Sequence, residues 1–132
     1  DLVKWHHSIN HVDLRDSSEY YKFLLTGVNT VIHCAAKTRI DPSWAEYSDY
    51  YNTNITASQS LFKACQEAGV KKFIYFSSSS VYGNSDKEQQ SETDPIQPTS
   101  PYAVSKAAAE MALRAQALKG TTELIIVRPF TM

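Results

Sequence analysis

Short apolar runs alternate along this chain with longer segments in which apolar residues recur every three or four positions. The short runs are rich in β-branched and aromatic side chains and predict strands, whereas the recurring spacing predicts helices. Strands are expected at residues 9–13, 30–35, 71–76 and 123–128, and helices at residues 17–26, 43–68 and 100–120. This alternation predicts an α/β fold with a parallel sheet and helices on both faces.

Local signals indicate where the helices begin and end. Gly27 and Gly69 directly follow two helical patterns, and glycine is favoured just after a helix because it adopts the left-handed conformation without strain. Ser100 is suited to cap the next helix, with Pro101 in its first turn, where the missing N–H costs nothing. Residues 84–99 lie between two predicted elements, and their mostly polar composition predicts a loop.

Composition excludes several classes of protein. The 132 residues suffice for one domain, and 14 acidic against 13 basic side chains leave no basic surface for nucleic acid. No stretch approaches the roughly 18 continuous apolar residues of a membrane span. Cys34 and Cys65 are isolated, and the histidines do not form a metal-ligand pattern with them. Because Cys34 lies in an apolar run, we expect a buried reduced thiol and a cytoplasmic protein.

Tyr102 and Lys106 lie four residues apart at the start of the last predicted helix. Residues i and i+4 share a helix face, so the phenol and the ammonium point the same way. A nearby cation favours the phenolate and lowers the tyrosine pKa from about 10 towards that of a general base. A hydroxyl from the serine run 77–80 could bind the same substrate oxygen. These groups suit proton removal from an alcohol as a hydride leaves its carbon.

The spacing of Tyr102 and Lys106 is weak evidence when taken alone, because a surface lysine on an alanine-rich helix gives the same pattern. The predicted topology adds support. In parallel sheets, functional groups collect at the carboxyl ends of the strands. That rule places Asp13, Cys34, Ala35, Ala36 and the serine run at one edge, with Tyr102 arriving from the following loop.

The motifs then resemble a known family, the extended short-chain dehydrogenase/reductases, and within it the NAD-dependent nucleotide-sugar epimerase/dehydratase group. The similarity runs in order through Asp13-Leu14, His33-Cys-Ala-Ala36, Asn54-Ile55, the segment S-S-S-S-V-Y-G ending at Gly83, Tyr102-x-x-x-Lys106 and Arg128-Pro-Phe130. The resemblance implies a Rossmann-type doubly wound parallel sheet. Residues 1–132 would then be one partial NAD(P)-binding Rossmann domain, with NAD as cofactor and NADP not excluded.

The resemblance also implies roles for individual residues. The catalytic set would be Ser78, Tyr102 and Lys106. The substrate, a nucleotide sugar, would contact Ser78, Ser79, Ser80 and Tyr102. Cofactor contacts would come from Asp13, Leu14, Cys34, Ala35, Ala36, Asn54, Tyr102, Lys106 and Phe130. Structural explanations compete for some of these: Asp13 as a turn cap, the alanines as tight packing and Phe130 as a core residue.

Two departures from the family pattern refine the expectation. Dehydratases of this family carry Asp-Glu directly after the catalytic hydroxyl, where this chain has Ser79 and Ser80. Without a carboxyl group at these two positions, the sequence offers no obvious acid or base for the elimination of water. This favours an epimerase that oxidises a sugar hydroxyl and returns the hydride to the other face. The alternatives are another reductase of the same fold, acting on a hydroxysteroid, flavonoid-like or small aldehyde substrate, or a non-catalytic scaffold.

The second departure is the absence of the family's glycine-rich phosphate turn among the four glycines. We therefore expect a fragment that lacks the first two strands and the C-terminal substrate lobe and is inactive alone. In the family order 3-2-1-4-5-6, the strands at residues 9–13 and 30–35 would be separated by a gap of about 10 Å or more. The resemblance further implies a homodimer through a four-helix bundle, with Ala107, Met111 and Leu118 on the second apolar stripe of the last helix.

Overall fold

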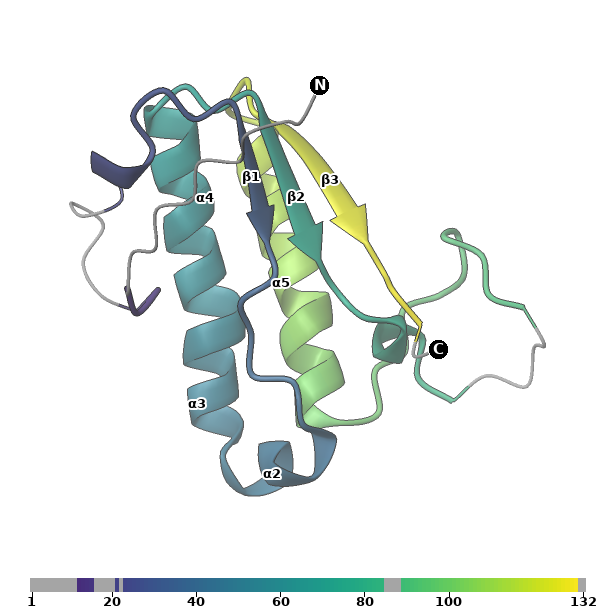
Figure 1. Ribbon diagram of the computed structural model, residues 1–132. Helices are drawn as coiled ribbons and strands as arrows, with labels where there is room; N and C mark the ends of the chain where they lie inside the picture. Colours follow the sequence, from purple (N-terminus) through teal and green to yellow (C-terminus); the bar gives the residue numbers. More distant parts are fainter. Residues whose placement is uncertain (1–11, 16–20, 22, 85–88, 131–132) are drawn as a thin grey trace, which may run out of the picture.

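The computed structural model describes residues 12–15, 21, 23–84 and 89–130 (Figure 1). Its sheet has three parallel strands in the order β1 (Thr30–His33), β2 (Lys72–Phe76) and β3 (Glu123–Val127). Thr30 lies opposite Lys72, and Lys72 lies opposite Glu123. The predicted parallel sheet is therefore confirmed, with each strand slightly shorter than its apolar run.

The helices follow the strands in alternation. After β1 come α2 (Ile40–Ala45), α3 (Tyr47–Tyr51), a π-helical segment (Asn52–Thr56) and α4 (Ala57–Glu67). After β2 come a 3-10 turn (Ser79–Tyr82) and α5 (Pro101–Ala117). No helix among the described residues has the length and apolar character that crossing a membrane requires.

The single helix predicted over residues 43–68 was wrong in detail. Helical structure begins earlier, at Ile40, and the chain turns at Glu46, which is neither helical nor extended. The π-helical segment then adds a wider turn before α4. The apolar spacing continues across these breaks, and for that reason the sequence pattern concealed them.

Several predicted boundaries are confirmed. Ser100 caps α5, its hydroxyl oxygen accepting the Ala103 N–H at 3.2 Å, and Pro101 occupies the first turn. Gly27 and Gly69 both have positive φ after helical segments. Cys34 is the exception. It lies past the end of β1 and is exposed, which contradicts the expected burial.

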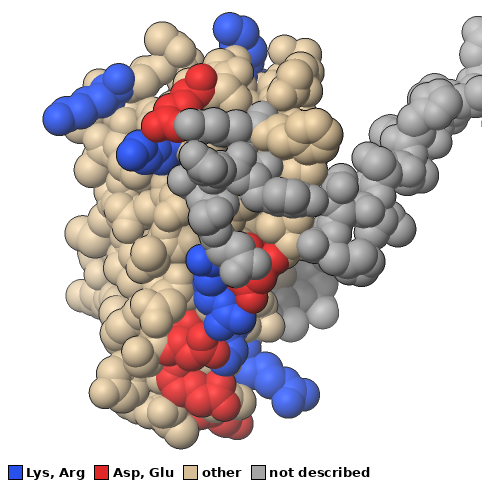
Figure 2. All heavy atoms as spheres, turned by 90° about the vertical axis from the view of Figure 1, so that its left-hand side faces the viewer, with Lys and Arg blue, Asp and Glu red and all other residues tan. Residues whose placement is uncertain are grey.

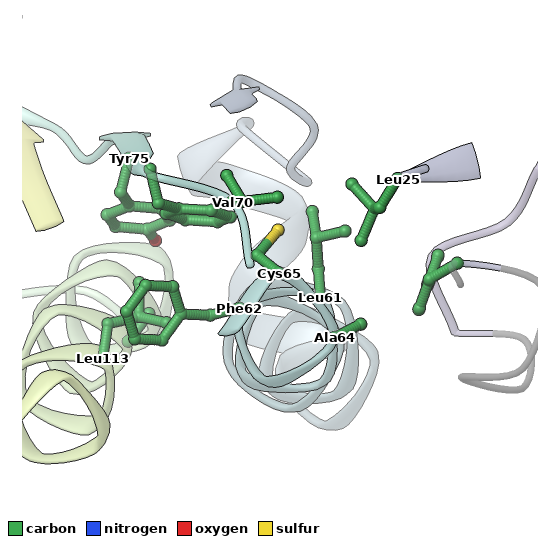
Figure 3. Packing of buried hydrophobic residues seen from close by; sticks show 11 residues of the cluster. Leu25, Leu61, Phe62, Ala64, Cys65, Val70, Tyr75 and Leu113 are labelled. Atoms are coloured by element: carbon green, nitrogen blue, oxygen red, sulfur yellow. The ribbon is translucent and has the colours of Figure 1, made fainter. Parts of the chain in front are cut away.

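The core lies between the sheet and two helices (Figure 3). Phe73 and Tyr75 on β2 point towards α4 and α5, and the rings of Phe62 and Phe73 lie 5.0 Å apart, edge to face. Leu113 of α5 and Cys65 of α4 complete the packing. Burial raises the pKa of the Cys65 thiol to about 12, which keeps it an inert apolar group.

Both long helices cover the same face of the sheet (Figure 1). Ile32 of β1 points the other way and is 62% exposed. We expected helices on both faces of the sheet. In the described part of the chain, helices cover one face only. Within residues 12–15, 21, 23–84 and 89–130, no strand pairs with the free edge of β1.

The predicted strand at residues 9–13 and helix at residues 17–26 lie mostly outside the described residues. Val12 and Asp13 are described and are not in a strand. Val12 and Leu14 pack against the core, and the Tyr21 hydroxyl donates to the Leu14 carbonyl. The expected gap between that strand and β1 stays a prediction.

Candidate active site

The three strands end at one edge of the sheet, where the motif residues follow them (Figure 1). Cys34 follows β1, the serine run follows β2, and Arg128 follows β3. The backbone holds the last two segments together. Ser77 N–H donates to the Val127 carbonyl at 2.8 Å, and Ser79 N–H donates to the Pro129 carbonyl at 3.1 Å.

Ser78 caps the 3-10 turn that follows β2. Its backbone is extended, and its Oγ accepts the Ser80 N–H at 3.2 Å. The side chain is nearly buried, with 9% exposure. Because the oxygen already accepts a hydrogen bond from the chain, the hydroxyl proton is left to donate to a substrate oxygen.

Lys106 lies on α5 and reaches across to the end of β2. Its ammonium donates to the Phe76 carbonyl at 2.5 Å and lies 4.5 Å from the centre of the Tyr75 ring. The residue is 3% exposed. Burial lowers the pKa of Lys106 to about 8, while the nearby Glu110 carboxylate opposes that shift. Two of its three protons remain for other partners.

Tyr102 lies in the first turn of α5, one turn before Lys106. Its N–H donates to Ser43 Oγ at 3.2 Å, which links the start of α5 to α2. Its ring meets the Tyr50 ring edge to face, with 6.5 Å between the ring centres, and the residue is 8% exposed. The fold therefore gathers Tyr102 and Lys106 on the helix beside the edge that carries Ser78.

Asn54 connects the loop after β1 to α5. Its amide nitrogen donates to Ser105 Oγ at 2.9 Å and to the Lys37 carbonyl at 3.0 Å, and its oxygen accepts the Lys37 N–H at 2.9 Å. Ser105 Oγ in turn donates to the Tyr102 carbonyl at 2.7 Å. Asn54 lies in the π-helical segment, and such segments occur frequently at functional sites.

His33 extends this buried network behind the site. Its Nε2 lies 2.7 Å from Ser58 Oγ, which donates to the Asn54 carbonyl. Burial, aided by the positive charge of Lys106, lowers the pKa of His33 to about 4. The imidazole is therefore neutral around pH 7, and sequence analysis assigned it no role.

This histidine predicts acid sensitivity of the fold. Between pH 6.5 and 4 the unfolded chain binds a proton that folded His33 does not, so the free energy of unfolding falls as the pH falls. The full loss would be about 3 kcal/mol. Urea unfolding at several pH values tests this, with His33→Gln expected to flatten the profile in that window. An unchanged pH slope in the variant would contradict the assignment.

An open cavity of about 690 Å³ lies beside the loop after β1. Residues predicted to bind the cofactor line it: Asp13, Leu14, Ala35 and Ala36. Because Ala35 and Ala36 have small side chains, a flat ligand could approach the backbone closely at this wall. Cys34, Asn54 and Phe130 are not part of this wall.

Charged side chains surround the same cavity. Arg15 donates to both carboxylate oxygens of Asp13 and to Asp49, and Lys37 pairs with Asp49 and Glu46. The hydrogen bonds from Arg15 lower the pKa of Asp13 to about 2. Figure 2 shows acidic and basic side chains side by side in the lower half of the face that it views. The prediction that Asp13 caps a turn also holds, since its Oδ1 accepts the Arg15 N–H at 2.9 Å.

A second cavity, of about 290 Å³, lies beside Ser80. Ile40 and Trp44 of α2 form its apolar wall, and the remaining lining residues are Ser80, Gly83, Asn84, Thr99, Ser100 and Ala103. Trp44 is 62% exposed. Sequence analysis missed Trp44, because a tryptophan inside a helical pattern is expected to face the core.

Phe130 is not a core residue. It is 56% exposed and stacks with Tyr82 at 6.5 Å between ring centres. Together with Tyr82 and Arg128 it lines a third cavity, of about 300 Å³. The structure therefore separates Phe130 from the cavity that holds Asp13 and the alanines.

Comparison with known proteins gives consistent relatives. The model of the family described as "NAD dependent epimerase/dehydratase family" matches residues 2–132. The dTDP-D-glucose 4,6-dehydratase of Mus musculus is 43% identical over 88 residues, which cover 67% of this chain and 25% of the relative.

Solved structures match over most of the chain. A dTDP-glucose 4,6-dehydratase from Streptomyces venezuelae with NAD bound has a TM-score of 0.85 and 34% identity, covering 89% of this chain and 36% of its own. A UDP-N-acetylglucosamine 4-epimerase from Methanobrevibacter ruminantium M1 has a TM-score of 0.82 and 34% identity. The match covers 89% of this chain and 37% of the epimerase chain.

These likenesses confirm the Rossmann-type fold. The chain spans about a quarter of the curated mouse relative and somewhat more than a third of the solved ones. Since the family model matches nearly every residue, the chain belongs to the NAD dependent epimerase/dehydratase family, within the extended short-chain dehydrogenase/reductases.

Proposed function

We propose that the protein carrying this chain is an NAD-dependent nucleotide-sugar epimerase of the UDP-sugar 4-epimerase type. The observation that carries this proposal is the cavity beside Ser80. None of its described lining residues ionises near neutral pH. Elimination of water from a sugar needs a proton donor and acceptor next to the reacting carbons. Inversion at a single carbon needs only the groups that exchange the hydroxyl proton and the hydride.

The residues present fit the cofactor. The cavity of about 690 Å³ combines small residues at the end of β1 with the Asp13 carboxylate and the Arg15 and Lys37 cations. Asp13 and Leu14 would hold the adenine end, and Ala35 and Ala36 would lie against the diphosphate and ribose. Asn54 supports this wall by holding both backbone polar groups of Lys37. NAD, when bound, would accept a hydride from the alcohol carbon and later return it.

Tyr102 would exchange the proton of the sugar hydroxyl. As the base it takes that proton while the carbon–hydrogen bond breaks, and as the acid it returns the proton when the bond reforms on the other face. Lys106 stabilises the phenolate with a charge held by the Phe76 carbonyl. Ser78 donates its free proton to the substrate oxygen throughout. Ser79 and Ser80 are proposed to contact the sugar.

Product identity tests the proposal. The full-length protein carrying this chain is incubated with NAD and, in separate reactions, UDP-glucose, UDP-N-acetylglucosamine and dTDP-glucose. An epimer of unchanged mass is expected from at least one of them. A keto-deoxy product lighter by one water, as dehydratase relatives would form, would overturn the epimerase assignment.

We also propose that the protein acts as a homodimer through α4 and α5, in the cytoplasm, where its isolated cysteines remain reduced. The expected apolar stripe is partly wrong. Ala107 is 4% exposed and packs against Val81 and Tyr82, whereas Met111 and Leu118 are 66% and 88% exposed.

Met111→Glu should therefore shift the full-length protein from dimer to monomer, because each subunit would bring an unpaired charge into the proposed apolar interface. Light scattering after gel filtration measures this. Phe23→Glu, an equally drastic change at an exposed phenylalanine that belongs to neither helix, is the control. A monomeric unmodified protein, or a dimeric Met111→Glu variant, would contradict the proposal.

A further inference from the structure

Arg128 forms a largely buried ion pair with Glu110 of α5. Its Nε donates to Glu110 Oε1 at 2.9 Å and its Nη2 donates to Glu110 Oε2 at 2.6 Å. The two side chains are 10% and 0% exposed. This two-pronged contact fixes the direction of the guanidinium as well as its distance. The carboxylate raises the pKa of Arg128 further, so the charge is permanent.

The third nitrogen of the same guanidinium contacts two other segments. Arg128 Nη1 donates to the Tyr82 hydroxyl at 2.8 Å and to the Glu92 carbonyl at 3.2 Å. The guanidinium also lies 5.0 Å from the centre of the Tyr82 ring. We call Arg128, Glu110, Tyr82 and the Glu92 carbonyl the Arg128 clamp. It joins the end of β3, α5, the 3-10 turn and the following loop.

The positions of these residues connect the clamp to the candidate catalytic groups. Glu110 lies one helical turn beyond Lys106 and two beyond Tyr102, on the same side of α5. Tyr82 closes the 3-10 turn that Ser78 caps at its start. One guanidinium therefore links the turn that carries Ser78 to the helix that carries Tyr102 and Lys106.

Stability alone does not explain such a group. A buried ion pair contributes little net stability compared with apolar residues of the same volume, because both charges must lose their hydration. The apolar contact of Val81 and Tyr82 with Ala107 already joins the turn to α5. The two hydrogen bonds from the planar Arg128 guanidinium to Glu110 also fix the orientation of the guanidinium. A lysine ammonium cannot reproduce this geometry.

We propose that Arg128 is a positioning residue that acts through Tyr82 and Glu110. It fixes the Ser78 hydroxyl relative to the Tyr102 phenol, so that both meet the same substrate oxygen. This inference rests on the proposed function for its catalytic consequence, whereas the clamp itself is a property of the fold. Sequence analysis assigned no role to Glu110, and none to Arg128 or Tyr82 beyond the family resemblance of their motifs.

A double-mutant cycle tests the catalytic consequence in the full-length protein. Tyr82→Phe removes one hydrogen bond to Arg128 and keeps the ring. We expect it to lower kcat about tenfold or more with little change in KM, because hydrogen bonds to charged groups are the strong ones. In a Ser78→Ala background, Tyr82→Phe should lower kcat by less than about twofold, because the hydroxyl that the clamp positions is absent.

Thr122→Val is the matched control. It removes a buried hydrogen bond of similar length, 2.8 Å to the Val70 carbonyl, at the opposite end of the sheet. Its effect on kcat should be small and the same in both backgrounds. Equal effects of Tyr82→Phe with and without Ser78 would overturn the positioning role and leave a merely structural contact.

Amide hydrogen exchange tests the clamp without any turnover. Tyr82→Phe and Arg128→Lys should both speed exchange of residues 79–83, whose N–H groups hold the turn, while β3 stays protected. Unchanged exchange there would overturn the clamp. If the unmodified protein turns over no nucleotide sugar, the proposed function fails, and the exchange result alone decides the clamp.

Discussion

Replacing Tyr102 with phenylalanine should lower turnover of a nucleotide sugar by about 10²- to 10⁴-fold, the range for loss of a positioned acid–base group. The substitution removes only the phenol oxygen. The ring keeps its edge-to-face contact with Tyr50, and the backbone N–H keeps its bond to Ser43 Oγ. The fold should therefore survive while the proton exchange is lost.

Steady-state rates of the full-length protein, with an NAD titration beside them, measure this. Cofactor affinity should fall far less than turnover, since Tyr102 is one of several predicted cofactor contacts and the cavity at Ala35 and Ala36 is untouched. Tyr47→Phe is the control, because Tyr47 is 55% exposed and lies outside the described cavities and contacts of the site. Normal turnover by the Tyr102→Phe variant would remove the phenol from the mechanism.

Replacing Gly83 with alanine should destabilise the fold by on the order of 3 kcal/mol, because strained backbone and a steric clash add together. Gly83 has φ 68° and ψ −148°, a conformation reserved for glycine. A Cβ placed there would lie 1.9 Å from the Gln97 carbonyl oxygen. The segments cannot separate freely, since Gln97 N–H donates to the Val81 carbonyl at 2.9 Å.

Gly69→Ala provides the matched control. Gly69 also has positive φ, 74°, but no atom lies within 4 Å of an added Cβ. The Gly69→Ala substitution should lower the free energy of unfolding by only about 1–2 kcal/mol, the ordinary penalty for a left-handed residue with a side chain. Chemical denaturation of both variants compares them directly. Equal losses would show that the contact with Gln97 relaxes without cost.

The sequence predicted the elements that rest on local chemistry. The helix start at Ser100 and Pro101 and the turns at Gly27 and Gly69 follow from capping and from backbone freedom, and the structure has them. The strands followed from apolar runs of strand length. The burial of Cys34 was wrong, because an apolar run does not reveal where strand pairing ends.

Other features depend on contacts between distant residues. The π-helical segment that holds Asn54 and the break at Glu46 interrupt no apolar spacing, so the pattern could not show them. The pairing of Arg128 with Glu110 joins a strand end to a helix 18 positions earlier. The candidate catalytic set was proposed from the spacing of Tyr102 and Lys106 and from the family resemblance. Its hydrogen-bond partners Phe76, Ser43 and Ser105 emerged only from the fold.

The proposed mechanism requires that Ser78, Tyr102 and Lys106 exchange the hydroxyl proton of a sugar while the hydrogen on its carbon leaves and returns. Following an isotope through one reaction distinguishes this mechanism from exchange of the carbon-bound hydrogen with water. The full-length protein, with NAD, receives a UDP-hexose that carries deuterium at the carbon to be inverted, in ordinary water. An epimer of unchanged mass that retains the deuterium is expected. An epimer whose deuterium has been replaced by hydrogen from water would contradict the mechanism.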